Sequence, residues 1–208
     1  MPPTGAMELR ALIRLCRVIV TGYSILYTDG IVCRILSDDM NGNVSRLESA
    51  AAELEKPGGG GGGGGAATLA DLLVQRGADG SPPSPHASGV YGARWVARTL
   101  RFVALLLEKL GAAPTLSIAD AGRSTYAETI APYHTPVMAF VVSFVLRWAP
   151  YRSWVLAHPL GGVTNEAACA ACASLSRLVA PIAAGITAAL EENGLNFADR
   201  ISAIPGGW

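Results

Sequence analysis

The sequence has few charged residues and no excess of either sign. Only 15% of its 208 residues are charged, and 16 Lys and Arg balance 16 Asp and Glu. Soluble domains usually carry about 25% charged residues. A nucleic-acid partner normally requires a basic surplus, so the balanced charge argues against one. Half of the residues are hydrophobic, which also excludes a disordered chain. The apolar side chains therefore need a place to be buried.

Long hydrophobic runs are also missing. A membrane-spanning helix needs about 20 mostly apolar residues. The cleanest run, 137–146, stops at Arg147, and the Ala-rich stretch 167–190 contains Arg177 and Pro181. Charged residues interrupt the N-terminal apolar segment, which does not fit a secretion signal. We therefore expect no membrane span and predict a cytoplasmic protein.

Signals for metal, cofactor or catalytic chemistry are weak. Cys169 and Cys172 form a C-x-x-C pair, but no second pair and no neighbouring histidine complete a zinc site, so buried helix thiols are favoured. The glycine run 58–65 has no Gly-Lys-Ser/Thr after it, as a phosphate loop requires. A hydrolase using Asp39 and His134 lacks a nucleophile elbow and metal ligands. We expect no catalytic residue, metal or cofactor.

Apolar residues recur at helical spacing rather than in alternation, which predicts an all-α fold. One apolar stripe starts with Leu9, Ile13 and Cys16. A second consists of Val44, Leu47, Ala51 and Leu54, with Asp38 or Asp39 as the N-cap of its helix. Further helices are expected at 95–110 with Gly111 as a stop, at 117–131, at 134–148, and at 165–178 and 182–193, divided or kinked at Pro181. A glycine-rich loop at 57–66 and a Pro/Gly loop at 77–89 connect them.

One candidate site is the helix face that carries Asp39, Asn43 and Arg46 at positions i, i+4 and i+7. The ordinary interpretation is a solvated face with a local ion pair. Gly42 is unusual there, because a mid-helix glycine costs about 1 kcal/mol relative to Ala. A glycine makes sense where something approaches the backbone closely.

A second candidate is the stripe of Arg94, Arg98 and Arg101 beside Trp95, and a third is the pair Tyr133 and His134. The ordinary interpretation of the arginine stripe is an amphipathic helix whose Trp covers the core. The functional interpretation is an indole platform beside polar groups, which suits stacking on a sugar ring.

Together these segments resemble the glycolipid transfer protein family. The matching pattern covers roughly residues 35–197 and reads Asp39-x-x-Gly42-Asn43-x-x-Arg46, then Trp95-x-x-Arg98-x-Leu100-x-Phe102, then Tyr133-His134, then Ala149-Pro150-Tyr151-Arg152. The resemblance implies a two-layer sandwich of α-helices that encloses an apolar pocket for lipid chains. It divides the chain into a divergent helical segment at 1–30, a family domain at 31–198 and an unmatched tail at 199–208.

The resemblance also implies a ligand and the residues that bind it. The protein would be a non-enzymatic, monomeric carrier of a glycosphingolipid that contacts membranes transiently, through residues such as Trp148 or Trp154. Family members that carry ceramide 1-phosphate have cationic residues at the positions of Tyr91 and Trp95, so the aromatic residues here favour a sugar. A ceramide 1-phosphate carrier, or a sensor that binds lipid without transfer, are the alternatives. The implied headgroup-binding residues are Asp39, Asn43, Arg46, Trp95 and His134, with Tyr91, Arg98 and Phe197 as additional candidates.

Within this set, the resemblance assigns a role to each main residue. Asp39 and Asn43 would bind sugar hydroxyls, and Asp39 would also accept from the ceramide amide N–H. Arg46 stands where the family usually has Lys, which keeps the charge but changes the geometry of its donors. Trp95 would stack under the first sugar, and His134 would bond the ceramide amide or carbonyl.

Overall fold

The computed structural model describes residues 6–26, 30–56, 65–75 and 88–196. Its helices are, in chain order, α1 (Leu9–Leu26), α2 (Gly30–Leu54), α3 (Leu69–Val74), α4 (Ser88–Ala112), α5 (Ile118–Thr129), the 3-10 helix η2 (Ala131–Tyr133), α6 (Pro136–Leu146), α7 (Arg152–Ala157) and α8 (Asn165–Glu192). Within these ranges the backbone forms no strand, only an isolated antiparallel bridge between Glu8 and Thr68. The predicted all-α class is confirmed.

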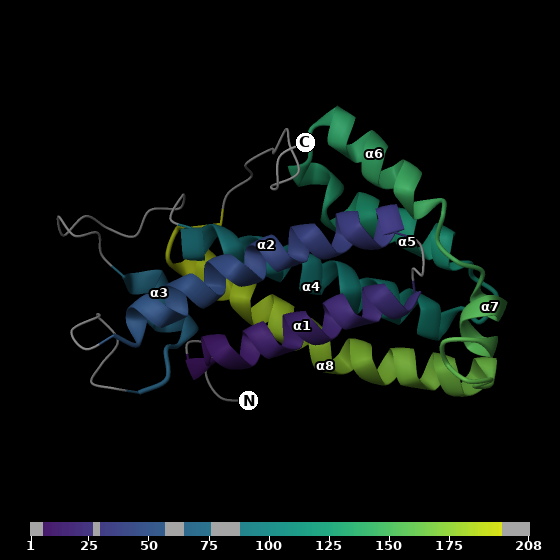
Figure 1. Cartoon of the computed structure of the whole chain (residues 1–208), viewed down its shortest axis with the longest axis horizontal. Coiled ribbons are helices and arrows are strands. Elements are labelled where there is room, and N and C mark those ends of the chain that lie inside the picture. The colour runs from purple at the N-terminus through teal and green to yellow at the C-terminus, as the bar shows by residue number, and fades with distance from the viewer. Residues whose placement is uncertain (1–5, 27–29, 57–64, 76–87, 197–208) are drawn as a thin grey trace.

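The helices form two layers. α1 packs against α2, α2 lies over α4, and α4 packs along α8, as Figure 1 shows. The ion pair Arg17–Glu48 joins α1 to α2, and Arg10–Glu55 joins α1 to the residue that follows α2. α5 packs on α4 and is followed by η2 and α6, which lie at the upper right of Figure 1. This is the two-layer helical sandwich that the family resemblance implied.

The tightly packed core occupies one end of the molecule. The predicted stripes on α1 and α2 are buried there, and they meet α3, the first half of α4 and the second half of α8. Toward its C-terminal end, α4 changes character. Its apolar side chains there are only partly buried, apart from Ala104. These partly buried residues are Phe102, Val103, Leu105, Leu106, Leu107 and Leu110.

Two predicted helix starts were placed too late. α2 begins at Gly30, so Asp38 and Asp39 lie in its interior and neither caps it. Apolar residues at 31, 32, 35 and 36 continue the helical spacing toward the N-terminus, which makes the earlier start possible. α4 begins at Ser88, so the last two residues of the predicted loop 77–89 are helical. Most of that loop, and of the glycine-rich loop, lies outside the described residues.

Of the two alternatives predicted for the last helix at Pro181, the division is wrong, and the kink stays a prediction. α8 continues through Pro181 without interruption, although proline removes one backbone hydrogen bond. Residues on both sides of it, Val179, Ala183 and Ile186, are buried, so packing favours one continuous helix. By length and composition alone, α8 is also apolar enough to cross a membrane, contrary to the expectation that no segment is.

Gly111 does not stop α4, which continues to Ala112. A Cβ atom at Gly111 would lie 2.9 Å from the backbone nitrogen of Ala173 and 3.0 Å from the carbonyl oxygen of Cys169, both on α8. Glycine is needed here because the two helices approach each other closely. Ser176 Oγ adds a hydrogen bond to the Ala104 carbonyl, 2.9 Å long, along the same contact.

Local capping signals determine where α5 and α6 begin. Ser117 accepts a hydrogen bond from the backbone of Asp120, and Thr135 accepts one from Met138 with Pro136 in the first turn. His134, predicted as the first residue of a helix, instead lies in extended backbone between η2 and α6. The cap at Thr135 therefore holds His134 at a fixed junction rather than on a helix face.

Candidate functional site

Asp39, Asn43 and Arg46 share one face of α2, as their spacing predicted. Asn43 Nδ2 donates to the carbonyl oxygen of Asp39 at 3.0 Å, and Arg46 Nη1 donates to Asn43 Oδ1 at 3.3 Å. Asn43 is only 1% exposed, so this face is not simply solvated. The bonds leave Asn43 with one N–H and one lone pair for another group.

The carboxylate of Asp39 lies in an unfavourable setting for a charge. No residue in the described ranges donates a hydrogen bond to it. Burial raises the pKa of Asp39 from its ordinary value of 3.8 to about 6, and the nearby Arg46 guanidinium acts in the opposite direction. A partly buried acceptor without a donor is costly to the folded protein and is a marker of functional sites.

Close packing of α4 on α2 brings the second candidate segment to this face. A Cβ atom at Gly92 would lie 3.0 Å from the carbonyl oxygen of Asn43 and 3.1 Å from Cβ of Arg46. Gly92 was missed in the sequence, although its spacing from Gly89 gives α4 a small-residue stripe. Gly42, which was singled out, has only its own neighbour Arg46 at 3.5 Å, an ordinary contact.

An aromatic cluster extends from this contact across α4 to η2. The Arg46 guanidinium lies over the ring of Tyr91 at 5.1 Å, and Tyr91 contacts Trp95 with ring centroids 6.3 Å apart. Trp95 stacks on His134, with centroids 5.6 Å apart and planes 24° from parallel. Trp95 is 3% exposed. No described residue lies at the distance and angle needed to accept a hydrogen bond from its indole N–H. The Tyr91 side chain nevertheless lies near enough to interact electrostatically with that N–H.

The predicted basic stripe is mostly buried rather than solvated. Arg94 and Arg98 are 1% and 6% exposed, and only Arg101 is open to solvent. Arg94 Nη1 donates to the carbonyl oxygen of Leu195 at 3.4 Å, which ties α4 to the segment after α8. The Arg98 guanidinium lies 4.7 Å from the Trp95 ring and 3.6 Å from the Tyr133 ring. These arginines therefore help to assemble the cluster.

His134 is held by a residue that the sequence did not reveal. Tyr126, on α5, places its hydroxyl 2.7 Å from His134 Nδ1. Burial, together with the positive charge of Arg98, lowers the pKa of His134, so the ring is neutral near pH 7. Burial raises the pKa of Tyr126 to about 12, so its hydroxyl keeps its proton. Helical spacing indicates that Tyr126 faces inward, but nothing local points to His134.

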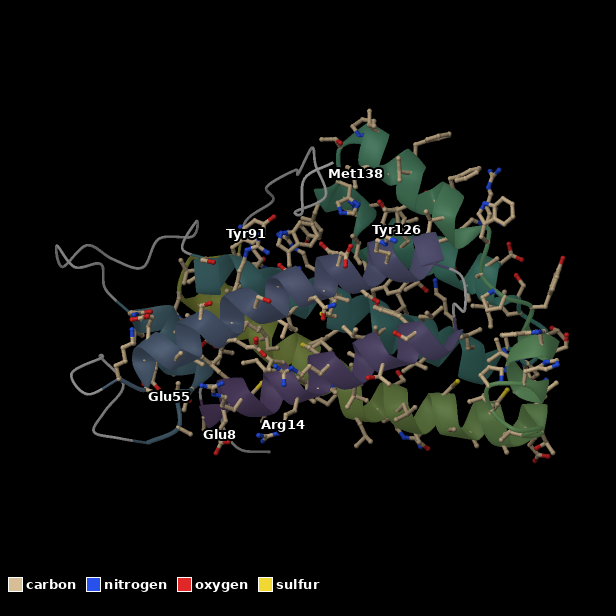
Figure 2. The ribbon with its side chains drawn as sticks, viewed as in Figure 1. Glu8, Arg14, Glu55, Tyr91, Tyr126 and Met138 are labelled. Atoms are coloured by element: carbon tan, nitrogen blue, oxygen red, sulfur yellow. The ribbon has the colours of Figure 1, made fainter. Side chains whose placement is uncertain are left out.

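The folded chain brings seven of the eight predicted site residues into one cluster where α2, α4 and η2 meet. Figure 2 shows Tyr91, Tyr126 and Met138 in the upper half of the molecule as it is viewed there, with Tyr126 and Met138 near α6. Phe197 lies outside the described residues. In the ranges that the structure describes, no group of three His, Cys, Asp or Glu side chains is arranged to hold a metal ion.

A comparison with protein families finds a match over most of the chain. The model of the family described as glycolipid transfer protein matches residues 7–158, well over half of the chain. The chain belongs to the glycolipid transfer protein family. The match begins at residue 7 and therefore includes α1. Proteins of this family are lipid transfer proteins rather than enzymes. A comparison with curated protein sequences finds no match.

Solved structures of the family have the same fold. A structure described by the words "How FAPP2 Selects Simple Glycosphingolipids Using the GLTP-fold" superposes with a TM-score of 0.73 at 19% identity, covering 93% of this chain and 90% of that chain. Human ceramide-1-phosphate transfer protein in complex with 12:0 ceramide-1-phosphate gives 0.70 at 17% identity, with 90% and 88% covered. A mutant of Arabidopsis ACD11 complexed with C12 ceramide-1-phosphate gives 0.67 at 17%, with 92% and 88% covered. The TM-scores establish the shared fold, and identities this low leave the headgroup undecided.

Proposed function

We propose that this protein is a cytosolic carrier that removes a glycosphingolipid from one membrane and delivers it to another without breaking any bond. The observation that carries the proposal is the Asp39 carboxylate, which is partly buried and lacks a donor among the described residues. It lies in one cluster with Asn43, Arg46 and neutral His134. A ligand that brings hydroxyl or amide N–H groups supplies the missing donors.

A sugar headgroup suits this face better than a phosphate does. Sugar hydroxyls donate to Asp39, and they also use the free N–H and lone pair of Asn43. A phosphate is largely ionised at neutral pH, offers few donors and is repelled by the carboxylate. Trp95 is covered in this structure, so a sugar stacks on its indole only after a neighbour such as the partly exposed Tyr91 moves aside.

The second half of α4 supports the binding of apolar lipid chains. Six apolar side chains there are only partly buried, from Phe102 to Leu110. Ceramide chains that lie against them remove this surface from water, and each buried methylene group contributes about 0.8 kcal/mol. The polar junction of the lipid then stays at the Asp39–His134 end, where donors and acceptors are available.

The outer face of α6 supports transient membrane contact. Three apolar side chains on this face of α6 follow helical spacing and are strongly exposed, Val137 70%, Phe140 73% and Phe144 50%, and Trp148, just beyond the end of the helix, is 67% exposed. Figure 2 shows side chains projecting outward along α6. Aromatic and aliphatic residues on one helix face are typical of peripheral membrane binding. Trp154 stacks on His158 at 5.2 Å and is partly buried, so Trp148 is the better of the two predicted membrane contacts.

The test is a transfer assay between vesicles with fluorescent lipids. We expect the purified protein to move monoglycosylceramide, and not phosphatidylcholine, from donor to acceptor vesicles. Trp95→Ala should reduce glycolipid transfer at least about ten-fold, as expected for loss of a stacking contact of roughly 1.4 kcal/mol or more. Absence of transfer for every sphingolipid would refute the carrier function, and lipid binding without transfer would indicate a sensor.

A ceramide 1-phosphate carrier is the second candidate, because two guanidinium groups belong to the cluster. Arg46 lies beside Asn43, and Arg98 lies between Trp95 and Tyr133. Guanidinium groups bind phosphate with paired hydrogen bonds. The two lipids are compared in the same assay. If the phosphate lipid is the cargo, it moves faster than the glycolipid, and Arg98→Gln impairs its transfer more than Trp95→Ala does.

A further inference from the structure

We propose that Tyr126 is a positioning residue that fixes the ring tautomer of His134, so that Nε2 carries the proton and serves as a hydrogen-bond donor to the bound lipid. This inference rests on the proposed function for the lipid, but the tautomer itself is a property of the protein alone. It concerns a contact between α5 and the junction before α6, which the sequence motifs do not contain.

Two hydrogen-bond directions are possible across the 2.7 Å contact between Tyr126 Oη and His134 Nδ1. Either the phenol donates to an unprotonated Nδ1, or a protonated Nδ1 donates to the phenol oxygen. Both side chains are neutral near pH 7, because burial raises the pKa of Tyr126 and lowers that of His134. An ion pair between them is therefore excluded, and the choice depends on where the phenol proton can go.

The Tyr126 O–H has one hydrogen-bond acceptor among the described residues. Tyr126 is 2% exposed, and among the described residues its hydroxyl has no hydrogen-bond partner other than His134. If Nδ1 carried the proton, the phenol O–H would be buried without an acceptor, which is costly. If the phenol donates to Nδ1, both groups are satisfied. Nδ1 is then an acceptor, and the neutral ring must carry its proton on Nε2.

The same contact also fixes the orientation of the ring. Stacking on Trp95, with planes 24° from parallel, holds the ring plane but does not distinguish one flip of the imidazole from the other. The hydrogen bond from Tyr126 distinguishes them, because a flipped ring would present carbon instead of Nδ1 to the hydroxyl. With its proton on Nε2, His134 binds a hydrogen-bond acceptor of the lipid, such as an amide carbonyl oxygen. The Asp39 carboxylate, in contrast, binds a hydrogen-bond donor of the lipid.

The first test measures the tautomer in the lipid-free protein by ¹⁵N NMR of labelled histidine. We expect the Nε2–H tautomer of His134 in the wild type and a mixture of both tautomers in Tyr126→Phe. Tyr151→Phe is the matched control, since this tyrosine is 85% exposed and takes part in none of the cluster contacts described above. A wild-type Nδ1–H tautomer, or an unchanged tautomer in Tyr126→Phe, would overturn the proposal.

The second test measures binding of fluorescent monoglycosylceramide. Tyr126→Phe should weaken binding about two- to twelve-fold, as expected for one hydrogen bond that is no longer aligned. In a His134→Ala background the same substitution should have almost no effect on binding, because Tyr126 acts on the lipid only through the His134 ring. An equal loss in both backgrounds would show a merely structural role and overturn the proposal. If no sphingolipid binds the wild type while the tautomer result holds, the proposed function fails and the tautomer assignment stands.

Discussion

Replacing Asp39 by Asn should make the lipid-free protein more stable and less able to bind lipid. Burial raises the pKa of this carboxyl from 3.8 to about 6, so the folded state binds more protons than the unfolded state between these values. The free energy of unfolding therefore falls as pH rises through this window and stays lower at neutral pH. Asn removes the buried charge but keeps the shape of the side chain.

The size of the effect follows from the shift. A change of one pKa unit corresponds to 1.36 kcal/mol, so the shift implies a gain of about 2–3 kcal/mol for Asp39→Asn at pH 7, allowing for partial exposure. For a chain of this length, that is an increase in Tm of roughly 5–10 °C. Only below about pH 3 is the wild-type carboxyl protonated in both states, and there the difference in stability should disappear.

Urea unfolding at a series of pH values between about 3 and 7 measures this difference. Asp38→Asn is the matched control, because Asp38 is the exposed neighbour on the same helix and should change stability little at any pH. Equal stability of wild type and Asp39→Asn at pH 7, or a difference that does not depend on pH, would refute the reasoning. The same variant should lose about ten-fold or more of its glycolipid transfer. If Asp39 had only a structural role, Asp39→Asn would lower both the stability of the protein and its transfer of glycolipid.

Two further predictions concern packing and membrane contact. Gly92→Ala should lower the free energy of unfolding by about 1–3 kcal/mol, because its Cβ meets the backbone of α2. Gly42→Ala should raise the free energy of unfolding by up to about 1 kcal/mol, because a Cβ there makes only an ordinary contact. Urea unfolding of both variants measures the two changes. Stability losses of similar size for both glycines would contradict this. The double substitution of Phe140→Ser and Phe144→Ser should weaken binding to vesicles at least about five-fold in a sedimentation assay without lowering stability. Leu178→Ser, at an equally exposed apolar position on α8, is the control, and an equal effect there would argue against α6 as the contact surface.

Much of the fold was predictable because helix formation and amphipathic spacing are local properties. The buried stripes on α1 and α2 were read directly from the sequence, as was the shared face of Asp39, Asn43 and Arg46. Helix ends were predicted less well. The start of α2 and the continuity of α8 through Pro181 depend on packing against neighbouring helices, which outweighs the local signals of Asp39 as a cap and proline as a breaker.

The candidate site depended on both levels. The sequence by itself determined the all-α class and the side chains available for binding, because helical periodicity and residue chemistry need no distant partner. Only the tertiary structure decided that Gly92 lets α4 reach α2, that Arg98 is buried between aromatic rings, and that Tyr126 bonds His134. These contacts join separate helices, and their geometry depends on how the two layers pack together rather than on any spacing along the chain.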